Sequence, residues 1–217
     1  DILSGKKNNT YDKSRTLGIS KSNIDYFNSQ IINIEKILWR IKHIKIYKKK
    51  NNKEEILKFN NNNQQIFSII KNYELQRELK RNLRKNKLIQ FKRTANYENI
   101  LKQEYKLIIN CDSKHQITKK FFSNKITKNY NSYAYTTIIN HKKVINNNTA
   151  FQNFTNGGPI AFLPISETQT SVVYSLRVKK KINDFDIKKM IKKYNPIYLI
   201  KKIHDYNCFE LRSSHLR

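Results

Sequence analysis

Arg15 and Asp112 are two charged side chains of types that can bind or orient a polar ligand. Arg15 lies in the segment DKSRTLGIS at residues 12–20, and its guanidinium group can donate paired hydrogen bonds to phosphate or carbonyl oxygens while staying charged. Asp112 follows the run YKLIIN at 105–110, which predicts a buried strand, and the simplest interpretation is that Asp112 caps a helix over 113–121. Taken alone, one arginine among 44 basic residues indicates nothing about function. Whether these two residues have a function therefore depends on the secondary-structure elements that position them.

The stretch from Thr149 to Val178 has the clearest strand chemistry of the chain. A Gly-Gly-Pro break at 157–159 and a polar turn at 166–170 separate runs of aromatic and β-branched residues, a pattern typical of an antiparallel meander. Together with the Tyr- and Thr-rich run before it, this predicts a predominantly antiparallel sheet over 130–176. Pro164 has no N–H, so its strand is expected at an edge or at a bulge.

Two helices are predicted from hydrophobic periodicity. Leucines recur at helical spacing after Asn72, a suitable N-cap, and predict a helix over 72–83. Residues 184–194 place their aliphatic side chains on one face and lysines on the other, which predicts a second helix. His141 stands at the end of a predicted strand, where we expect a surface residue and not a ligand.

The net charge of +28 would ordinarily indicate a polyanionic partner such as RNA, DNA or an anionic membrane. The excess is in lysine, beside many Asn, Ile and Tyr residues, and it is spread along the chain. These are residues with AT-rich codons, so drift of an AT-rich genome explains the same composition. We favour drift; a basic nucleic-acid-binding protein of ribosomal type stays as the alternative.

Cysteine content and hydropathy exclude several classes of protein. Cys111 and Cys208 are too few and too far apart for a disulfide framework or a zinc site, so no metal is expected. No apolar run approaches the roughly 20 residues of a membrane span, and no signal-peptide pattern is seen. These features favour a cytoplasmic location. The chain starts without a methionine and ends without a closing element, so we expect an internal fragment of a longer reading frame.

The order AF-x-x-FT-x-x-GP-x-A-x-LP at 150–164 resembles the substrate-side sheet of FAD-dependent aromatic hydroxylases with the para-hydroxybenzoate-hydroxylase-like fold. The resemblance is to the polyprenylphenol hydroxylases of ubiquinone biosynthesis in particular, and it covers most of residues 12–211. Arg15 matches the arginine that lies against the flavin nucleotide in that family. Asp112 matches an aspartate that positions the flavin pyrophosphate and the nicotinamide cofactor. Phe162, Leu163 and Pro164 are then expected nearest to the aromatic substrate.

The resemblance implies a mixed α/β fold. A partial flavin-binding, Rossmann-like domain at 1–40 and 68–128 would join a predominantly antiparallel substrate-binding sheet domain at 41–67 and 129–217. It further implies FAD as cofactor, NAD(P)H as electron donor, and hydroxylation of a polyprenylated phenol by molecular oxygen. No catalytic residue can be assigned, no nucleic-acid partner is expected, and the oligomeric state is not indicated. The implied location is the cytoplasm, with peripheral association with the inner membrane.

Four departures limit this resemblance. Ser113 stands where the family has glycine and Gln116 where it has serine, and a Cβ at Ser113 hinders close approach to a phosphate. The glycine-rich turn G-x-G-x-x-G and the segment G-D-A-A-H are both missing, since the chain has only four glycines. An internal fragment explains both absences, because the two motifs belong just outside the ends of the resemblance. A degenerate member that kept the fold but lost catalysis is the second explanation.

Overall fold

The computed structural model describes residues 2–4, 13–50, 52–60, 64–93, 102, 105–111, 115–122 and 125–216. The chain forms two compact units, of which one comprises Asp12–Arg81 and Tyr130–Leu211. The other comprises Asp1–Tyr11, Asn82–Asn129 and Arg212–Arg217. These boundaries differ from those of the expected domains at 1–40 with 68–128 and at 41–67 with 129–217, and that functional division stays a prediction.

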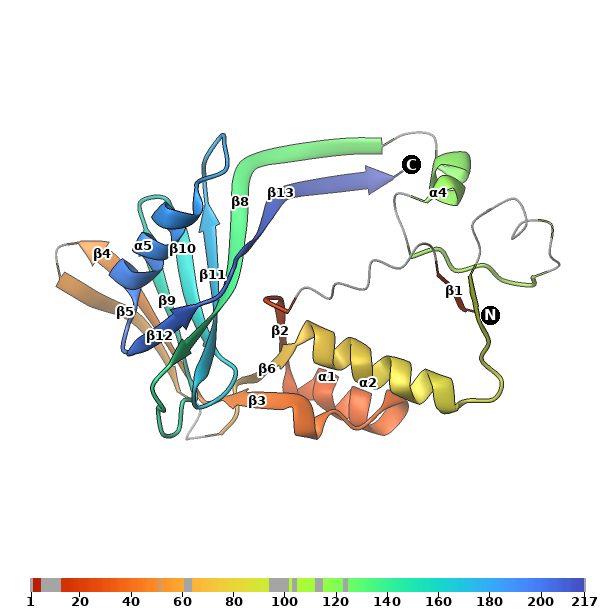
Figure 1. Ribbon diagram of the computed structural model, residues 1–217, viewed down its shortest axis with the longest axis horizontal. Helices are drawn as coiled ribbons and strands as arrows, with labels where there is room; N and C mark the ends of the chain where they lie inside the picture. Colours follow the sequence, from red (N-terminus) through yellow and green to blue (C-terminus); the bar gives the residue numbers. More distant parts are fainter. Residues whose placement is uncertain are drawn as a thin grey trace. The chain divides into compact units, whose positions relative to one another are not determined.

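An eight-stranded mixed sheet dominates the structure (Figure 1). Its path in space is β12 (Ile200–Ile203), β8 (Lys125–His141), β11 (Gln169–Leu176), β10 (Gly158–Pro164), β9 (Thr149–Thr155), β4 (His43–Lys50) and β5 (Asn52–Asn60), and β13 (Asn207–Leu216) also pairs with β8. All neighbours from β12 to β9 are antiparallel. β4 and β5 are also antiparallel, whereas β4 and β9 run parallel. The mixed α/β class and the predominantly antiparallel sheet over 130–176 are therefore confirmed.

A smaller antiparallel sheet has the order β2 (Thr16–Ile19), β6 (Phe67–Lys71) and β3 (Leu38–Ile41). Between β2 and β3 the chain forms α1 (Lys21–Tyr26), the π-helical turn η1 (Phe27–Ile31) and the 3-10 turn η2 (Glu35–Ile37). The helix α2 (Asn72–Lys85) follows β6 directly. The remaining described elements are the parallel pair β1 (Ile2–Ser4) and β7 (Phe91–Arg93), and the helices α4 (Gln116–Phe121) and α5 (Asp184–Tyr194).

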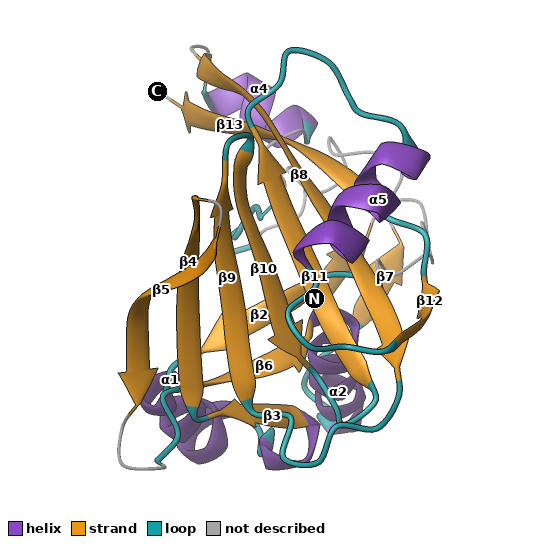
Figure 2. Cartoon of the chain, turned by 90° about the vertical axis from the view of Figure 1, so that its left-hand side faces the viewer, coloured by secondary structure: helices purple, strands orange, loops and turns teal. Residues whose placement is uncertain are grey.

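The unit that comprises Asp12–Arg81 and Tyr130–Leu211 is built in layers. Its large sheet lies between α5 on one side and the small sheet on the other (Figure 2). Beneath α5, Ile187 and Ile191 are 1% exposed and pack into a core that includes Tyr135, Phe162 and Tyr174. Further hydrophobic clusters fill the space between the two sheets and the space between the small sheet and the helices α1 and α2. Burial of these apolar side chains is the main stabilising contribution to each layer.

Both predicted helices are confirmed, α2 with two more residues at its end and α5 with the expected bounds. The helix α5 begins after Asn183, whose side-chain oxygen accepts a hydrogen bond from the Asp186 N–H at 2.9 Å. Acidic residues in its first turn and lysines in its last turn complement the helix dipole. Local sequence therefore specifies where this helix begins and ends.

We expect Asn183→Ala to destabilise the chain by about 1 kcal/mol, because the first turn of α5 loses its capping acceptor. Urea unfolding followed by circular dichroism measures the loss. The matched control is Asn23→Ala in α1, an exposed asparagine that caps no helix in the described part of the chain, and it should change stability by only a few tenths of a kcal/mol. Equal effects of the two substitutions would contradict the capping role.

The expectation that Pro164 marks an edge or a bulge is wrong. Its strand β10 lies inside the sheet, and Pro164 is the last residue of that strand, paired with Thr170 of β11. The next residue, Ile165, donates its N–H to Gln169, so the nitrogen of Pro164 faces the opposite side, towards β9. Because the register with β9 ends at Phe162, the missing N–H interrupts no hydrogen bond of the ladder.

Two predictions around Asp112 are also corrected. Residues 105–110 form no strand, and Leu107 and Ile109 are 75% and 77% exposed. An apolar run becomes a buried strand only where neighbouring strands pair with it, which periodicity cannot indicate. The following helix α4 begins at Gln116, not at 113, and its N-cap is His115, whose Nδ1 accepts from the Ile117 N–H at 3.2 Å. Asp112 itself lies outside the described residues.

Candidate functional site

The two faces of the large sheet are covered very differently. Successive residues of a strand point to opposite faces, so Ile160 and Phe162 share one face with their β11 neighbours Val172 and Tyr174. All four are at most 1% exposed and lie in the core beneath α5. The opposite face is covered by the small sheet over only part of its area, and the rest is the candidate site.

Three polar contacts show where this coverage ends. Lys71 donates to Gln169 at 3.2 Å, the Thr16 and Ser171 hydroxyls lie 3.0 Å apart, and the Ser14 and Thr136 hydroxyls lie 2.8 Å apart. Gln169, Ser171 and the Val173 partner Thr136 follow one another along the same face. The segment before β2 therefore crosses the sheet as far as Thr136, where Ser14 is buried.

Beyond Thr136 the face carries small or neutral side chains that are partly buried or exposed. We call this surface the open half-face; it comprises Ala134, Gln152, Phe154, Pro159, Ala161, Val173 and Ser175. None of these seven side chains is ionisable, so they can bind and orient an apolar ring but cannot transfer protons. The exposed Lys48 of β4 is the register neighbour of Phe154 on the same face. The sequence held one signal for this surface, the small residues at every second position of β8 and β11, such as Ala134, Ser171 and Ser175. The predictions from the sequence did not use this signal.

Arg15 lies at the border of the open half-face. Its neighbours Ser14 and Thr16 point to the sheet, and Arg15 itself is exposed. Its backbone carbonyl accepts the Asn72 N–H at 3.0 Å, so Arg15 is held at the N-terminus of the 14-residue helix α2. The positive end of a helix dipole favours an anion, and Glu74 in the first turn of α2 already lies there, paired with Lys71 at 3.7 Å.

The other predicted site residues lie as follows. Phe162 is 0% exposed in the core beneath α5, 6.3 Å from Tyr198 between ring centroids. Leu163 points to the opposite face and packs in the cluster between the two sheets. One substrate ring cannot contact Phe162, Leu163 and Pro164 from one side, because neighbouring strand residues alternate. Asp112 is not described, so its proximity to Arg15 stays a prediction, and so does the role of all five residues.

His141 is buried and does not lie at the surface as expected. It is 2% exposed, its Nδ1 donates to the Lys142 carbonyl at 2.7 Å, and its Nε2 lies 3.0 Å from the Thr170 hydroxyl. Its ring lies 4.4 Å from that of Tyr198 between centroids. Burial raises the pKa of Tyr198 to about 12, although a hydrogen bond with Thr170 opposes the rise. The His141 and Tyr198 rings therefore pack against each other at the end of the large sheet.

The described residues offer neither a cluster of metal ligands nor a membrane-spanning helix. They contain no group of three or more His, Cys, Asp or Glu side chains that could hold a metal ion. None of the helices in this part of the chain is long and apolar enough to cross a membrane.

Comparison with known proteins gives a likeness of fold. No family model and no curated protein matches the sequence. Among solved structures, HpxO of Klebsiella pneumoniae in complex with FAD and uric acid aligns with a TM-score of 0.63 at 11% identity, over 91% of this chain and 58% of its own. The tetracycline destructase Tet(51) aligns with a TM-score of 0.56 at 11% identity, over 96% of this chain and 62% of its own. Tet(55), another tetracycline destructase, aligns with a TM-score of 0.59 at 10% identity, over 98% and 62%.

The chain therefore has the fold seen in these proteins, and it spans about three fifths of their length. This agrees with the mixed α/β class expected from the flavoprotein resemblance. At such low identity, the likeness shows the fold and leaves activity, cofactor and substrate to be proposed.

Proposed function

We propose that this chain is part of an FAD-dependent monooxygenase and that its open half-face walls the space in which flavin and substrate meet. The observation that carries the proposal is the open half-face itself, whose seven side chains are neutral, with the backbone of Arg15 held nearby at the N-terminus of α2. The likeness to HpxO, a protein solved with FAD and uric acid, supports it.

The residues present fit part of an FAD molecule. Arg15 provides a permanent cation for the phosphates, and the small side chains of the open half-face allow a planar ring to approach the strands. Asp112 would contribute on the pyrophosphate side. The glycine-rich turn that holds a pyrophosphate through backbone N–H groups does not occur in these 217 residues, so flanking sequence has to supply it.

In this proposal the cofactor provides oxygen activation and the protein provides binding and orientation. The open half-face has no ionisable side chain, so its part is to position the substrate ring and to exclude water from it. The core beneath α5 keeps the strands rigid behind that surface, which favours one fixed geometry between the two rings.

The finer assignment is a polyprenylated phenol of ubiquinone biosynthesis as substrate, with molecular oxygen as co-substrate and NAD(P)H as donor. The motif at 150–164 supports it, because that motif forms β9, the turn and β10, which together provide four of the seven residues of the open half-face. A nucleic-acid-binding function is not favoured, since the fold is similar to that of HpxO, a protein solved with FAD and uric acid.

The test uses the chain extended at both ends by the flanking residues of its reading frame. We expect Arg15→Ala and Asp112→Ala each to weaken FAD binding by about 1–3 kcal/mol, through loss of a charge-assisted hydrogen bond. Flavin fluorescence quenching during titration with FAD measures the dissociation constant. The control is Arg40→Ala, which removes an exposed arginine on β3 paired with Glu35 and should leave the dissociation constant within about twofold.

The site assignment would be wrong if both variants bound FAD like the parent protein. If the extended protein binds no FAD at all, the cofactor itself and with it the proposed function are excluded.

A further inference from the structure

The turn between β9 and β10 consists of an asparagine followed by a glycine, Asn156 and Gly157. β9 ends at Thr155, β10 begins at Gly158, and these two residues are register partners. Asn156 is exposed, and within the described part of the chain its side-chain amide has no hydrogen-bond partner. The turn therefore leaves this amide free to react in solution.

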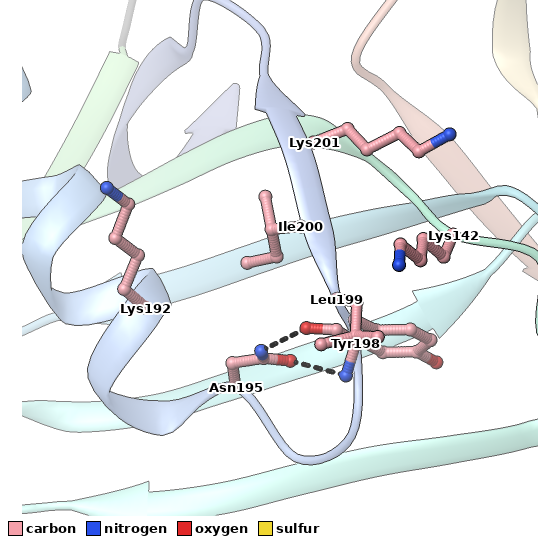
Figure 3. A pocket seen from close by; sticks show the side chains of 7 residues that line it. All are labelled: Lys142, Lys192, Asn195, Tyr198, Leu199, Ile200 and Lys201. Carbon is pink, nitrogen blue, oxygen red and sulfur yellow. Dashed lines mark hydrogen bonds between the residues drawn. The ribbon is translucent and has the colours of Figure 1, made fainter.

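The residue after an asparagine decides how reactive the amide is, because its backbone nitrogen can attack the side-chain carbon Cγ. Gly157 has no Cβ to hinder that approach. Asn195, beside the open pocket drawn in Figure 3, is the opposite case. Its side chain is held by the Tyr198 backbone through hydrogen bonds of 2.6 and 3.0 Å. The residue after it is Pro196, whose nitrogen carries no hydrogen. Of these two asparagines, only Asn156 can form a cyclic imide within an intact chain.

The fold nevertheless restrains the Gly157 nitrogen. Its N–H donates to the Thr155 hydroxyl at 3.2 Å, while the Gly157 carbonyl accepts the Arg177 N–H at 2.9 Å. The Thr155 hydroxyl itself donates to the Gly158 carbonyl at 2.7 Å and lies 3.2 Å from the hydroxyl of the fully buried Tyr174. Thr155 is thus fixed from the core side, and the Gly157 nitrogen is available only after its N–H leaves the Thr155 hydroxyl.

We propose that Asn156 is a site of spontaneous deamidation and that the Thr155 hydroxyl sets its rate. Once the Gly157 amide has given its proton to a base in the solvent, its nitrogen forms a bond to Asn156 Cγ. The Cγ–Nδ2 bond breaks, and Nδ2 takes up a proton from the solvent and leaves as ammonia. Water then opens the cyclic imide at either of its two carbonyl carbons, which gives aspartate or isoaspartate. One water is consumed and one ammonia is released, and nothing is oxidised or reduced.

The products change the turn in two ways. Both add a negative charge at an exposed position, and isoaspartate also adds a methylene group to the main chain. The longer main chain cannot keep the hydrogen bonds of Gly157 with Thr155 and Arg177 in their present geometry. Because Phe154 and Pro159 of the open half-face are register partners beside this turn, the modification alters the edge of that surface. The proposal rests on the turn itself and is independent of the proposed function.

The first test follows the conversion in the folded chain. The full chain is incubated at mildly alkaline pH and digested at intervals, and mass spectrometry identifies the converted peptides. A sample taken at the start corrects for conversion during digestion. We expect aspartate and isoaspartate to accumulate at Asn156 faster than at Asn23, an exposed asparagine followed by the β-branched Ile24, and not at all at Asn195. Asn156→Gln should suppress the signal in its peptide, because the longer side chain would have to close a larger ring.

The second test removes the Thr155 hydroxyl. Thr155→Val keeps the branched shape but leaves the Gly157 N–H without its acceptor, so Asn156 in the folded chain should convert about threefold to tenfold faster. Thr155→Ser keeps the hydroxyl and should convert like the parent. The matched control Thr149→Val removes a hydroxyl at the other end of β9 and should stay within about twofold of the parent. In urea, where no turn is formed, parent and Thr155→Val should convert at equal rates.

Three results would overturn the proposal. A folded parent chain that keeps Asn156 intact, while the same chain converts in urea, would show that the turn excludes the reaction. Equal rates for the folded parent and folded Thr155→Val would show that the hydroxyl does not set the rate. A faster rate of Thr155→Val that persists in urea would assign the effect to the local sequence and not to the turn.

Discussion

Gly158→Ala is expected to destabilise the chain by about 3–5 kcal/mol, among the largest effects of any single substitution. Gly158 opens β10 with a φ of 137°, a backbone conformation that side chains with a Cβ rarely adopt. A Cβ at this position would lie 2.1 Å from the backbone carbonyl oxygen of Ser175. Because that oxygen belongs to β11, which is paired on both sides, it cannot move aside without shifting the sheet.

Urea unfolding measures this effect, with Gly18→Ala as the matched control. Gly18 lies in β2, where an added Cβ would lie 3.5 Å from the Phe67 ring, an ordinary contact distance. We expect the control to change the free energy of unfolding by less than about 1 kcal/mol. Equal stability of the Gly158→Ala variant and the parent would show that the turn does not have this geometry.

Phe162→Ala is expected to cost about 3–5 kcal/mol, because it leaves a cavity in the core beneath α5. Phe162 is 0% exposed, and its ring lies near that of Tyr198, which closes the end of the core. Phe162→Leu should restore most of the loss, since it keeps the site apolar and largely filled. Thermal and urea unfolding of the two variants give the comparison.

Phe154→Ala is the control for position on the sheet. Phe154 belongs to the open half-face and is 45% exposed, so its removal should cost less than about 1 kcal/mol. In the extended protein the two substitutions should differ in their effect on substrate affinity. We expect Phe162→Leu to leave that affinity unchanged and Phe154→Ala to weaken it. A Phe162→Leu variant that folds normally but loses substrate affinity would support the predicted place of Phe162 in the substrate pocket.

Several elements could be predicted from the sequence because short-range chemistry specifies them. The helix α5 has its cap, its apolar face and its charge bias within a dozen residues, and its bounds Asp184–Tyr194 were predicted correctly. The hairpins between β9, β10 and β11 follow from turn residues between alternating runs. The expected fold class followed from these elements and from the motif at 150–164. That motif contains Gly158, where any residue with a Cβ would be strained.

Only the tertiary structure decided which face of each strand is covered. A period of two shows that Phe162 and Leu163 point to opposite sides, but not that α5 lies on one side and the small sheet partly on the other. For the same reason His141 was expected at the surface, although loop 195–199 places Tyr198 against its ring. The position of Arg15 at the border of the open half-face depends on contacts of Ser14 and Thr16 with residues more than a hundred positions away. Alternation along a strand is set by the backbone of that strand, whereas burial is set by whichever distant segment packs on it.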